Sequence, residues 1–154
     1  MNLNNVKYIN EFRRLPYPKN QMIIIGSGTL ALLGIRKNND IDIWCSPALE
    51  KKIAKDKNFT YKISKLDGSK IYVSKDEIFE ISSTLGQVRG SSFDDALKRS
   101  LVVYGIHFHN PRDVLHWKKT VNRPKDRDDI KKLEAYLKKN VVETYLAIMQ
   151  SIRG

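Results

Sequence analysis

Apolar residues recur along the chain with two different periods, and the period at each point predicts the local structure. Spacings of three to four residues leave one apolar stripe on a helix, whereas alternation or a short β-branched run is typical of a strand. Helices are expected at residues 3–15, 27–33, 47–56, 93–100, 111–120, 130–137 and 142–152. Strands are expected at residues 22–25, 40–45, 59–64, 70–74, 78–82, 101–104 and 106–109. The pattern therefore predicts a mixed α/β (α+β) fold.

Turn-forming residues define some of these boundaries. Pro16 is expected to end the first helix, and Ser27 is expected to cap the second. Asp67 and Gly68 separate two strand-like runs and predict a hairpin, so part of the sheet is expected to be antiparallel. A polar loop is expected at residues 86–92. The expected architecture is a mixed, partly antiparallel sheet flanked by helices, with further helices at the C-terminal end.

The length and composition predict one domain. The chain has 154 residues, of which 41% are hydrophobic, and this supplies enough apolar surface for one modest core. We expect a single domain over residues 1–154, with a core at about 20–110 and a helical part at about 111–154. No stretch has the length and apolarity of a membrane span, and the first residues lack the apolar core of a signal peptide. A cytoplasmic protein without a membrane partner is therefore expected.

The chain is strongly basic. It contains 28 Lys and Arg against 17 Asp and Glu, which gives a formal net charge of +11. A field of this sign attracts polyanions by releasing their counterions, without distinguishing one sequence from another. The charge favours a nucleotide or nucleic-acid partner, but many basic proteins bind nothing specific.

Cysteine and histidine do not predict a metal centre. The single cysteine, Cys45, excludes an intramolecular disulfide and a cysteine-based zinc cage. His107 and His109 lie on the same face of an expected strand, but such a pair is more typical of partly buried histidines than of a zinc site.

One constellation of residues points to chemistry. Gly26 and Ser27 follow the first expected strand, and Asp40 and Asp42 open the next strand after twelve intervening residues. A glycine turn at the start of a helix lets backbone N–H groups and the Ser27 hydroxyl approach phosphate groups. Two carboxylates one residue apart on a strand point to the same side and can share Mg²⁺, which prefers oxygen ligands.

A third carboxylate is expected from a neighbouring strand. Glu80 has apolar neighbours on both sides, as at the centre of a strand, and is favoured over Asp76 and Glu77. An outward-facing strand residue would produce the same pattern, so a surface position for Glu80 stays open.

These features together resemble a known family. The order of Gly26 and Ser27, a short helix, and Asp40 and Asp42 on a strand is similar to that of the polymerase-β-type nucleotidyltransferase superfamily. The resemblance is greatest to the minimal bacterial and phage proteins related to AbiEii-type toxins. Three later segments, which begin at Phe93, Pro111 and Arg123, extend it over roughly residues 20–139.

The resemblance implies an Mg²⁺-dependent enzyme that moves a nucleoside monophosphate from a nucleoside triphosphate (NTP) to an acceptor hydroxyl and releases pyrophosphate. The catalytic residues would be Asp40, Asp42 and Glu80, which would bind two Mg²⁺ ions, with Mn²⁺ as an alternative metal. The nucleotide would be bound by Gly26, Ser27, Lys118, Arg123 and Asp126. The favoured acceptor is RNA, such as tRNA, although a protein hydroxyl or a small molecule such as an antibiotic is also compatible with the superfamily.

Two other classes of protein stay open. The run from Gly26 to Ala31 fits the G-x-G-x-x-A spelling of dinucleotide-binding Rossmann enzymes, which predicts parallel strand-helix-strand units. A catalytically inactive nucleic-acid-binding module on the same fold would also account for the charge. A separate alternative for the later motif is that Lys118 or Lys119 is simply solvated and that the charged residues of the following loop only cap and charge-complement the next helix. These loop residues are Arg123, Lys125 and Asp126.

Overall fold

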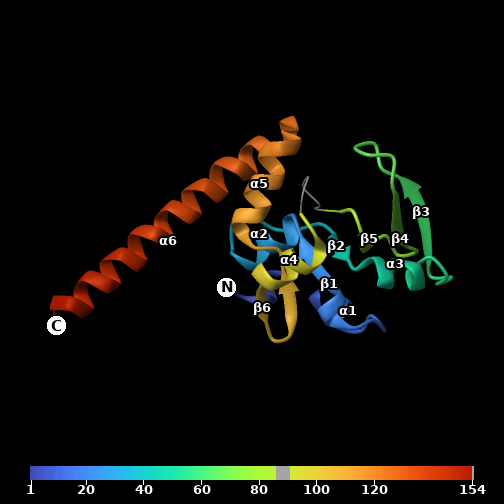
Figure 1. Ribbon diagram of the computed structural model, residues 1–154, viewed down its shortest axis with the longest axis horizontal. Helices are drawn as coiled ribbons and strands as arrows, with labels where there is room; N and C mark the ends of the chain where they lie inside the picture. The colour runs from blue at the N-terminus through green and yellow to red at the C-terminus, as the bar shows by residue number, and fades with distance from the viewer. Residues whose placement is uncertain (86–90, 154) are drawn as a thin grey trace.

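The computed structural model describes residues 1–85 and 91–153, and within them the chain forms a seven-stranded mixed sheet packed against helices (Figure 1). The strands are β1 (Met22–Ile25), β2 (Ile41–Cys45), β3 (Phe59–Ile63), β4 (Lys70–Ser74), β5 (Phe79–Ser82), β6 (Leu101–Val103) and β7 (Ile106–Phe108). The α-helices are α1 (Ile9–Arg13), α2 (Ser27–Leu32), α3 (Pro47–Ile53), α4 (Phe93–Arg99), α5 (Pro111–Val121) and α6 (Arg127–Arg153). Three short 3₁₀ helices are η1 (Leu3–Asn5), η2 (Lys19–Gln21) and η3 (Pro124–Asp126). The predicted mixed α/β architecture is confirmed, and most of the loop expected at 86–92 lies outside the described residues.

The single N-terminal helix expected at residues 3–15 is wrong. Tyr8 has a left-handed backbone conformation (φ 68°), which divides the segment into η1 and the five-residue α1. A spacing of three residues drifts around a continuous helix, so such a helix would turn its first and last apolar residues to opposite sides. The break instead allows four of these residues to reach the core, namely Leu3, Val6, Ile9 and Phe12.

The start of α2 also differs from the expectation. Gly26, and not Ser27, is the N-cap residue, and its backbone (φ 58°, ψ −123°) lies in a region open mainly to glycine. Ser27 is the first helical residue, and its hydroxyl has no hydrogen-bond partner among the described residues. A Cβ atom on Gly28 would lie 2.3 Å from Cγ2 of Ile24, so α2 packs directly on β1. The two glycines thus hold the start of α2 against the end of β1.

The two C-terminal helices expected at 130–137 and 142–152 are one helix. α6 runs for 27 residues without interruption, because the segment that joins the two expected helices contains neither glycine nor proline. Leu133 and Leu137 pack against side chains of α2 and α5, whereas the part of the helix beyond Leu137 extends away from the body of the protein (Figure 1). No helix in the described part of the chain is long and apolar enough to cross a bilayer.

Strand directions in the sheet exclude a dinucleotide-binding Rossmann fold. The strand order is β3-β4-β5-β2-β1-β7-β6. Although α2 joins β1 to β2, these two strands run antiparallel, so the unit is not the parallel crossover that a Rossmann enzyme needs. β5 pairs with β2 in parallel, and β7 pairs with β1 in parallel. The expected hairpin is confirmed as the antiparallel pair of β3 and β4.

The two faces of the sheet have different surroundings. On one face, Ile24 and Ile43 belong to the main core, which includes side chains of α1 and α3. On the other face, Trp44 packs against Phe93 of α4, and its indole N–H donates to the carbonyl of Ser83. Since side chains alternate along β2, this second face also carries the aspartates that the sequence singled out.

Candidate functional site

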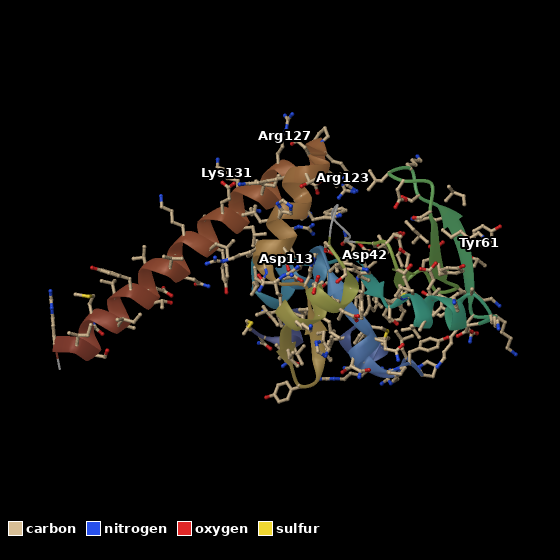
Figure 2. All side chains as sticks on the ribbon, in the orientation of Figure 1. Asp42, Tyr61, Asp113, Arg123, Arg127 and Lys131 are labelled. Carbon is tan, nitrogen blue, oxygen red and sulfur yellow. The ribbon has the colours of Figure 1, made fainter. Side chains whose placement is uncertain are left out.

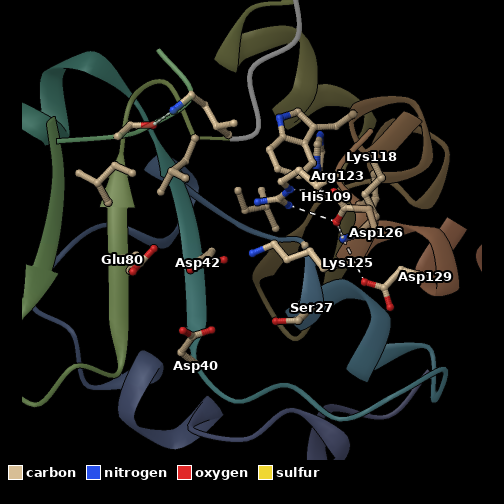
Figure 3. Close-up of a pocket in the computed structure, with 18 of the residues that line it drawn as sticks. Ser27, Asp40, Asp42, Glu80, His109, Lys118, Arg123, Lys125, Asp126 and Asp129 are labelled. Carbon is tan, nitrogen blue, oxygen red and sulfur yellow. Dashed lines mark hydrogen bonds and ion pairs between the residues drawn. The ribbon is translucent and has the colours of Figure 1, made fainter. Parts of the chain in front are cut away.

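A cleft of about 680 Å³ lies between the second face of the sheet and the segment formed by α5, η3 and the start of α6 (Figure 3). It is lined by every residue to which the sequence assigned a catalytic or nucleotide-binding role, namely Gly26, Ser27, Asp40, Asp42, Glu80, Lys118, Arg123 and Asp126. The structure therefore brings separate sequence motifs together around one cavity. The roles of these residues stay predictions.

The carboxylates stand on two neighbouring strands. Asp42 of β2 lies directly opposite Glu80 of β5, because these strands pair in parallel in that register. Asp40 directly precedes β2, and alternation turns it to the same side as Asp42. Figure 3 shows all three carboxylates along the same wall of the cleft. Glu80 therefore faces the cleft, with its side chain 24% exposed.

Asp42 is in an unfavourable environment for a negative charge. Its Oδ1 atom is buried and has no hydrogen-bond partner among the described residues. Burial, together with the negative charges of Asp40 and Glu80, raises the pKa of Asp42 to about 7. Burial and the charge of Glu80 also raise the pKa of Asp40. A cation bound at this wall would lower the pKa of both aspartates toward the ordinary value.

Glu80 already has a cationic partner within the chain. Lys62 of β3 forms a short ion pair with Oε1 of Glu80, and this hydrogen bond raises the pKa of the Lys62 ammonium group. The Lys62 side chain is 53% exposed, so the pair contributes little to stability. Glu80 can therefore exchange Lys62 for another cation at small cost.

The three acids do not form a finished metal cage. Within residues 1–85 and 91–153, no group of three or more His, Cys, Asp or Glu side chains is arranged to hold a metal ion. Mg²⁺ usually takes one or two protein carboxylates and fills its shell with water and substrate phosphates. Asp40 and Asp42 can supply these carboxylates, and the unpartnered Oδ1 of Asp42 agrees with such a role. To bind a metal ion, Glu80 would first have to break its ion pair with Lys62.

Gly26 and Ser27 offer hydrogen-bond donors at the base of the cleft. No atom lies within 4 Å of the position that a Cβ on Gly26 would take, so the backbone there is open to a ligand. α2 has only six residues, and its dipole is correspondingly weak. The N–H groups at the start of α2 and the Ser27 hydroxyl are therefore the groups suited to hold phosphate oxygens.

Lys118 lies at the centre of a buried ion-pair network. Its Nζ atom is 3.0 Å from Oδ1 of Asp126 and 3.1 Å from Oδ2 of Asp129. Arg123 donates two hydrogen bonds to Asp126, of 2.7 and 3.1 Å. Arg36 donates two hydrogen bonds to Asp129, of 2.6 and 2.9 Å. The network ties α5, η3 and α6 to the loop that follows α2.

The ion-pair network bears on two alternatives that the sequence left open, namely a solvated Lys118 and a charged loop that only stabilises the start of the next helix. A solvated Lys118 is wrong, because the residue is only 3% exposed. Asp126 does more than stabilise a helix start, because it is buried and accepts hydrogen bonds from both Lys118 and Arg123. A phosphate group at Lys118 would have to compete with two carboxylates.

Lys125 and Arg123 provide accessible positive charge in the cleft. Lys125 extends toward Asp42 in Figure 3, and its charge opposes the rise in the pKa of Asp42 and Asp40. It forms no ion pair within the described segments. The guanidinium carbon of Arg123 lies 4.9 Å from the ring centre of Trp117. Lys125 is thus better placed than Lys118 to contact a ligand bound beside the carboxylates.

Sequence reasoning gave no site role to five charged residues that line the cleft, namely Arg36, Lys62, Lys65, Lys125 and Asp129. For two of these residues the sequence contains a pattern that could have indicated a position in the cleft. Asp129 follows Asp126 by three residues at a helix start, a spacing that places both on one side. Lys62 alternates with apolar residues in a strand of the expected hairpin. Arg36, Lys65 and Lys125 lie outside α-helices and strands, where no periodicity predicts the direction of a side chain.

The histidines have separate surroundings. His109 packs at the edge of the Trp44 ring, and burial lowers its pKa to about 4. Nδ1 of His107 lies 2.8 Å from the hydroxyl of Ser100. His107 is partly buried, as the sequence indicated, whereas His109 is fully buried. Cys45 is a buried free thiol.

Comparison with known proteins does not assign the chain to a family, since neither family models, nor curated proteins, nor solved structures match it. The resemblance to nucleotidyltransferases therefore rests on the residues themselves.

Proposed function

We propose that this protein is an Mg²⁺-dependent nucleotidyltransferase that transfers a nucleoside monophosphate from an NTP to an acceptor hydroxyl. The observation that carries the proposal is the register of β2 and β5, which sets Glu80 opposite Asp42 and beside Asp40 in one cleft. The opposite side of the cleft carries Arg123 and Lys125. Carboxylates facing cations suit a ligand that combines metal ions with phosphate groups.

The proposed reaction is a displacement at phosphorus. The acceptor oxygen forms a bond to the α-phosphorus, the bond from that phosphorus to the β-phosphate bridging oxygen breaks, and pyrophosphate leaves. Asp40, whose pKa is raised by burial and by Glu80, takes the proton of the acceptor hydroxyl. Bound to Asp40, Asp42 and Glu80, two Mg²⁺ ions, or Mn²⁺ in their place, would supply neutralisation of the phosphate charge and a more acidic acceptor hydroxyl.

The other residues of the cleft position the substrate. Backbone N–H groups at Gly26 and the hydroxyl of Ser27 hold phosphate oxygens, and Lys125 adds a positive charge beside them. Lys118 acts indirectly, because its pairs with Asp126 and Asp129 hold η3, and with it Arg123 and Lys125, against the cleft. Lys118 is thus a positioning residue in this proposal.

RNA is the acceptor that the charge distribution favours. Arg127, Lys131 and Lys138 lie four and seven residues apart on α6 and therefore share one side of the helix. None of the three forms an ion pair within the described residues. Figure 2 shows Arg123, Arg127 and Lys131 following one another from the cleft along α6. We call Arg127, Lys131 and Lys138 the basic row of α6, along which a polyanion could lead to the carboxylates.

A second candidate is a catalytically inactive nucleic-acid-binding module. The observation in its favour is the ion pair of Glu80 with Lys62, because an internal cation already neutralises the third acid. Such a protein would bind RNA through the basic row without transferring a nucleotide.

Incubation with Mg²⁺, each α-labelled NTP and total RNA tests the proposal, with products analysed on denaturing gels and by mass spectrometry. The wild type should transfer label and release pyrophosphate, and Asp42→Asn should reduce transfer by about 100-fold or more. Asp94→Asn, a change of the same kind at an exposed position, should leave transfer unchanged. Near-wild-type transfer by Asp42→Asn would rule out the site. RNA binding without transfer to RNA, protein or small-molecule acceptors would favour the inactive module.

A further inference from the structure

The second half of α6 carries an unusual concentration of exposed apolar side chains. Among the large hydrophobic residues that are exposed in the described segments, half lie between residues 141 and 152. They are Val141, Val142, Tyr145, Leu146, Ile148 and Ile152, each 51–72% exposed. We call this set the apolar stripe of α6. An exposed patch of this kind is typical of an interaction surface.

The stripe follows the periodicity of helix pairing. Residues 141, 145, 148 and 152 are separated by four, three and four positions, which is the spacing of a coiled-coil seam. Val142 and Leu146 widen the seam on one side. The opposite side of the same segment carries small or polar residues, among them Glu143, Ala147 and Ser151. The helix therefore presents one apolar face along its length.

Nothing in the described part of the chain covers this face. The packing of α6 against α2 and α5 ends at Leu137, and the helix continues away from the body (Figure 1). The continuation is rich in β-branched residues, namely Val141, Val142, Thr144, Ile148 and Ile152, which have modest helix propensity. An isolated helix of this length is marginal in water, so its stability depends on packing of the apolar face.

We propose that the apolar stripe pairs with the same stripe of a second copy of this chain, as an antiparallel two-fold helix pair. The exposed stripe offers at most roughly 600 Å² per copy, so its complete burial in a pair would remove about 1,200 Å² from water, which is the lower end of the range for specific interfaces. The stripe itself contains no charged residue, so two copies can meet there although each carries a charge of +11. An isologous pair of this kind closes on itself as a dimer.

The charge also selects the antiparallel arrangement. In a parallel pair the two basic bodies would lie at the same end and repel each other. The antiparallel pair places them at opposite ends, with Val141 opposite Ile152 of the second copy and Tyr145 opposite its Ile148. The inference rests on α6 alone and is independent of the proposed enzymatic function.

Sedimentation equilibrium of the full chain from low to high micromolar concentration tests the pairing. The wild type should dimerise with a micromolar dissociation constant. Ile148→Glu, in the middle of the seam, should weaken dimerisation by about 100-fold or more. Ala147→Glu introduces the same charge on the opposite side of the helix and should leave dimerisation unchanged.

Cysteine cross-linking tests the direction of the pair, because the native Cys45 is buried. Under mild oxidation, a mixture of the Val141→Cys and Ile152→Cys proteins should form heterodimeric disulfides, and neither protein alone should cross-link efficiently. Efficient cross-linking of Val141→Cys with itself would overturn the antiparallel arrangement. A monomeric wild type, or equal effects of Ile148→Glu and Ala147→Glu, would overturn the dimer. A monomer that bound anionic lipid vesicles through the stripe would assign it to a membrane surface instead.

Discussion

Replacement of Asp42 by asparagine should stabilise the folded protein at neutral pH. The change keeps the size of the side chain and removes a charge whose Oδ1 atom is buried without a partner. In the folded protein the pKa of Asp42 is raised to about 7 from an ordinary value of 3.8, so the folded state binds the proton more tightly than the unfolded chain. The free energy of unfolding of the wild type should therefore fall between about pH 4 and about pH 7 and then level off.

The size of the effect follows from the difference between the two pKa values. It corresponds to about 4 kcal/mol lost from the wild type at pH 8. Water or a monovalent cation drawn toward the carboxylate would reduce this loss to about 2 kcal/mol. Asp42→Asn should be as stable as the wild type near pH 4 and more stable by about 2 to 4 kcal/mol at pH 8.

Urea denaturation at a series of pH values, followed by tryptophan fluorescence, measures this difference, and both the buried Trp44 and the cleft residue Trp117 contribute to the signal. Asp94→Asn, at an exposed position, should follow the wild type at every pH. Mg²⁺ at about 100 times its dissociation constant should stabilise the wild type at pH 8 by about 2.7 kcal/mol and should not stabilise Asp42→Asn. A stability difference between Asp42→Asn and the wild type that stays constant from pH 4 to pH 8 would refute the assigned environment of Asp42.

Three further changes test other parts of the structure. Gly28→Ala should lower the free energy of unfolding by about 1–3 kcal/mol, because a Cβ there meets β1 at 2.3 Å, and an unchanged denaturation midpoint would contradict this packing. Lys118→Met should lower the free energy of unfolding by about 3 kcal/mol, because it leaves the buried carboxylates of Asp126 and Asp129 underpaired. Lys119→Met removes a half-exposed ion pair with Glu134 and should lower this free energy by less than about 1 kcal/mol. Equal losses in the two variants would contradict the buried network. Changing the basic row of α6 to alanine should reduce the slope of log affinity for single-stranded RNA against log salt by about 2. The same change at three exposed lysines outside the cleft should leave this slope nearly intact, and an equal reduction would show that binding does not follow α6; these control residues are Lys51, Lys52 and Lys55.

Local patterns in the sequence were sufficient for most of the secondary structure and for the first half of the site. Alternation along residues 40–45 placed Asp40 and Asp42 on one side of a strand, because side-chain direction in a strand depends only on position along it. Asp67 and Gly68 predicted the hairpin for a similar reason, since turn geometry is set by a few adjacent residues. The motif Gly26 and Ser27 was also correctly placed at the start of a short helix, although the cap belongs to Gly26.

Interactions between segments distant in the sequence decided the second half of the site and the break in the N-terminal segment. The sequence could suggest Glu80 as a third acid, but only the parallel pairing of β5 with β2 sets it opposite Asp42. The burial of Lys118 between Asp126 and Asp129 depends on how α5 and α6 meet, and no spacing within either helix determines that. The break at Tyr8 likewise depends on packing, because one straight helix could not bury all four of the side chains that reach the core. These four are Leu3, Val6, Ile9 and Phe12. Periodicity is a property of one segment, whereas charge environment, burial and pairing arise only when segments pack against each other.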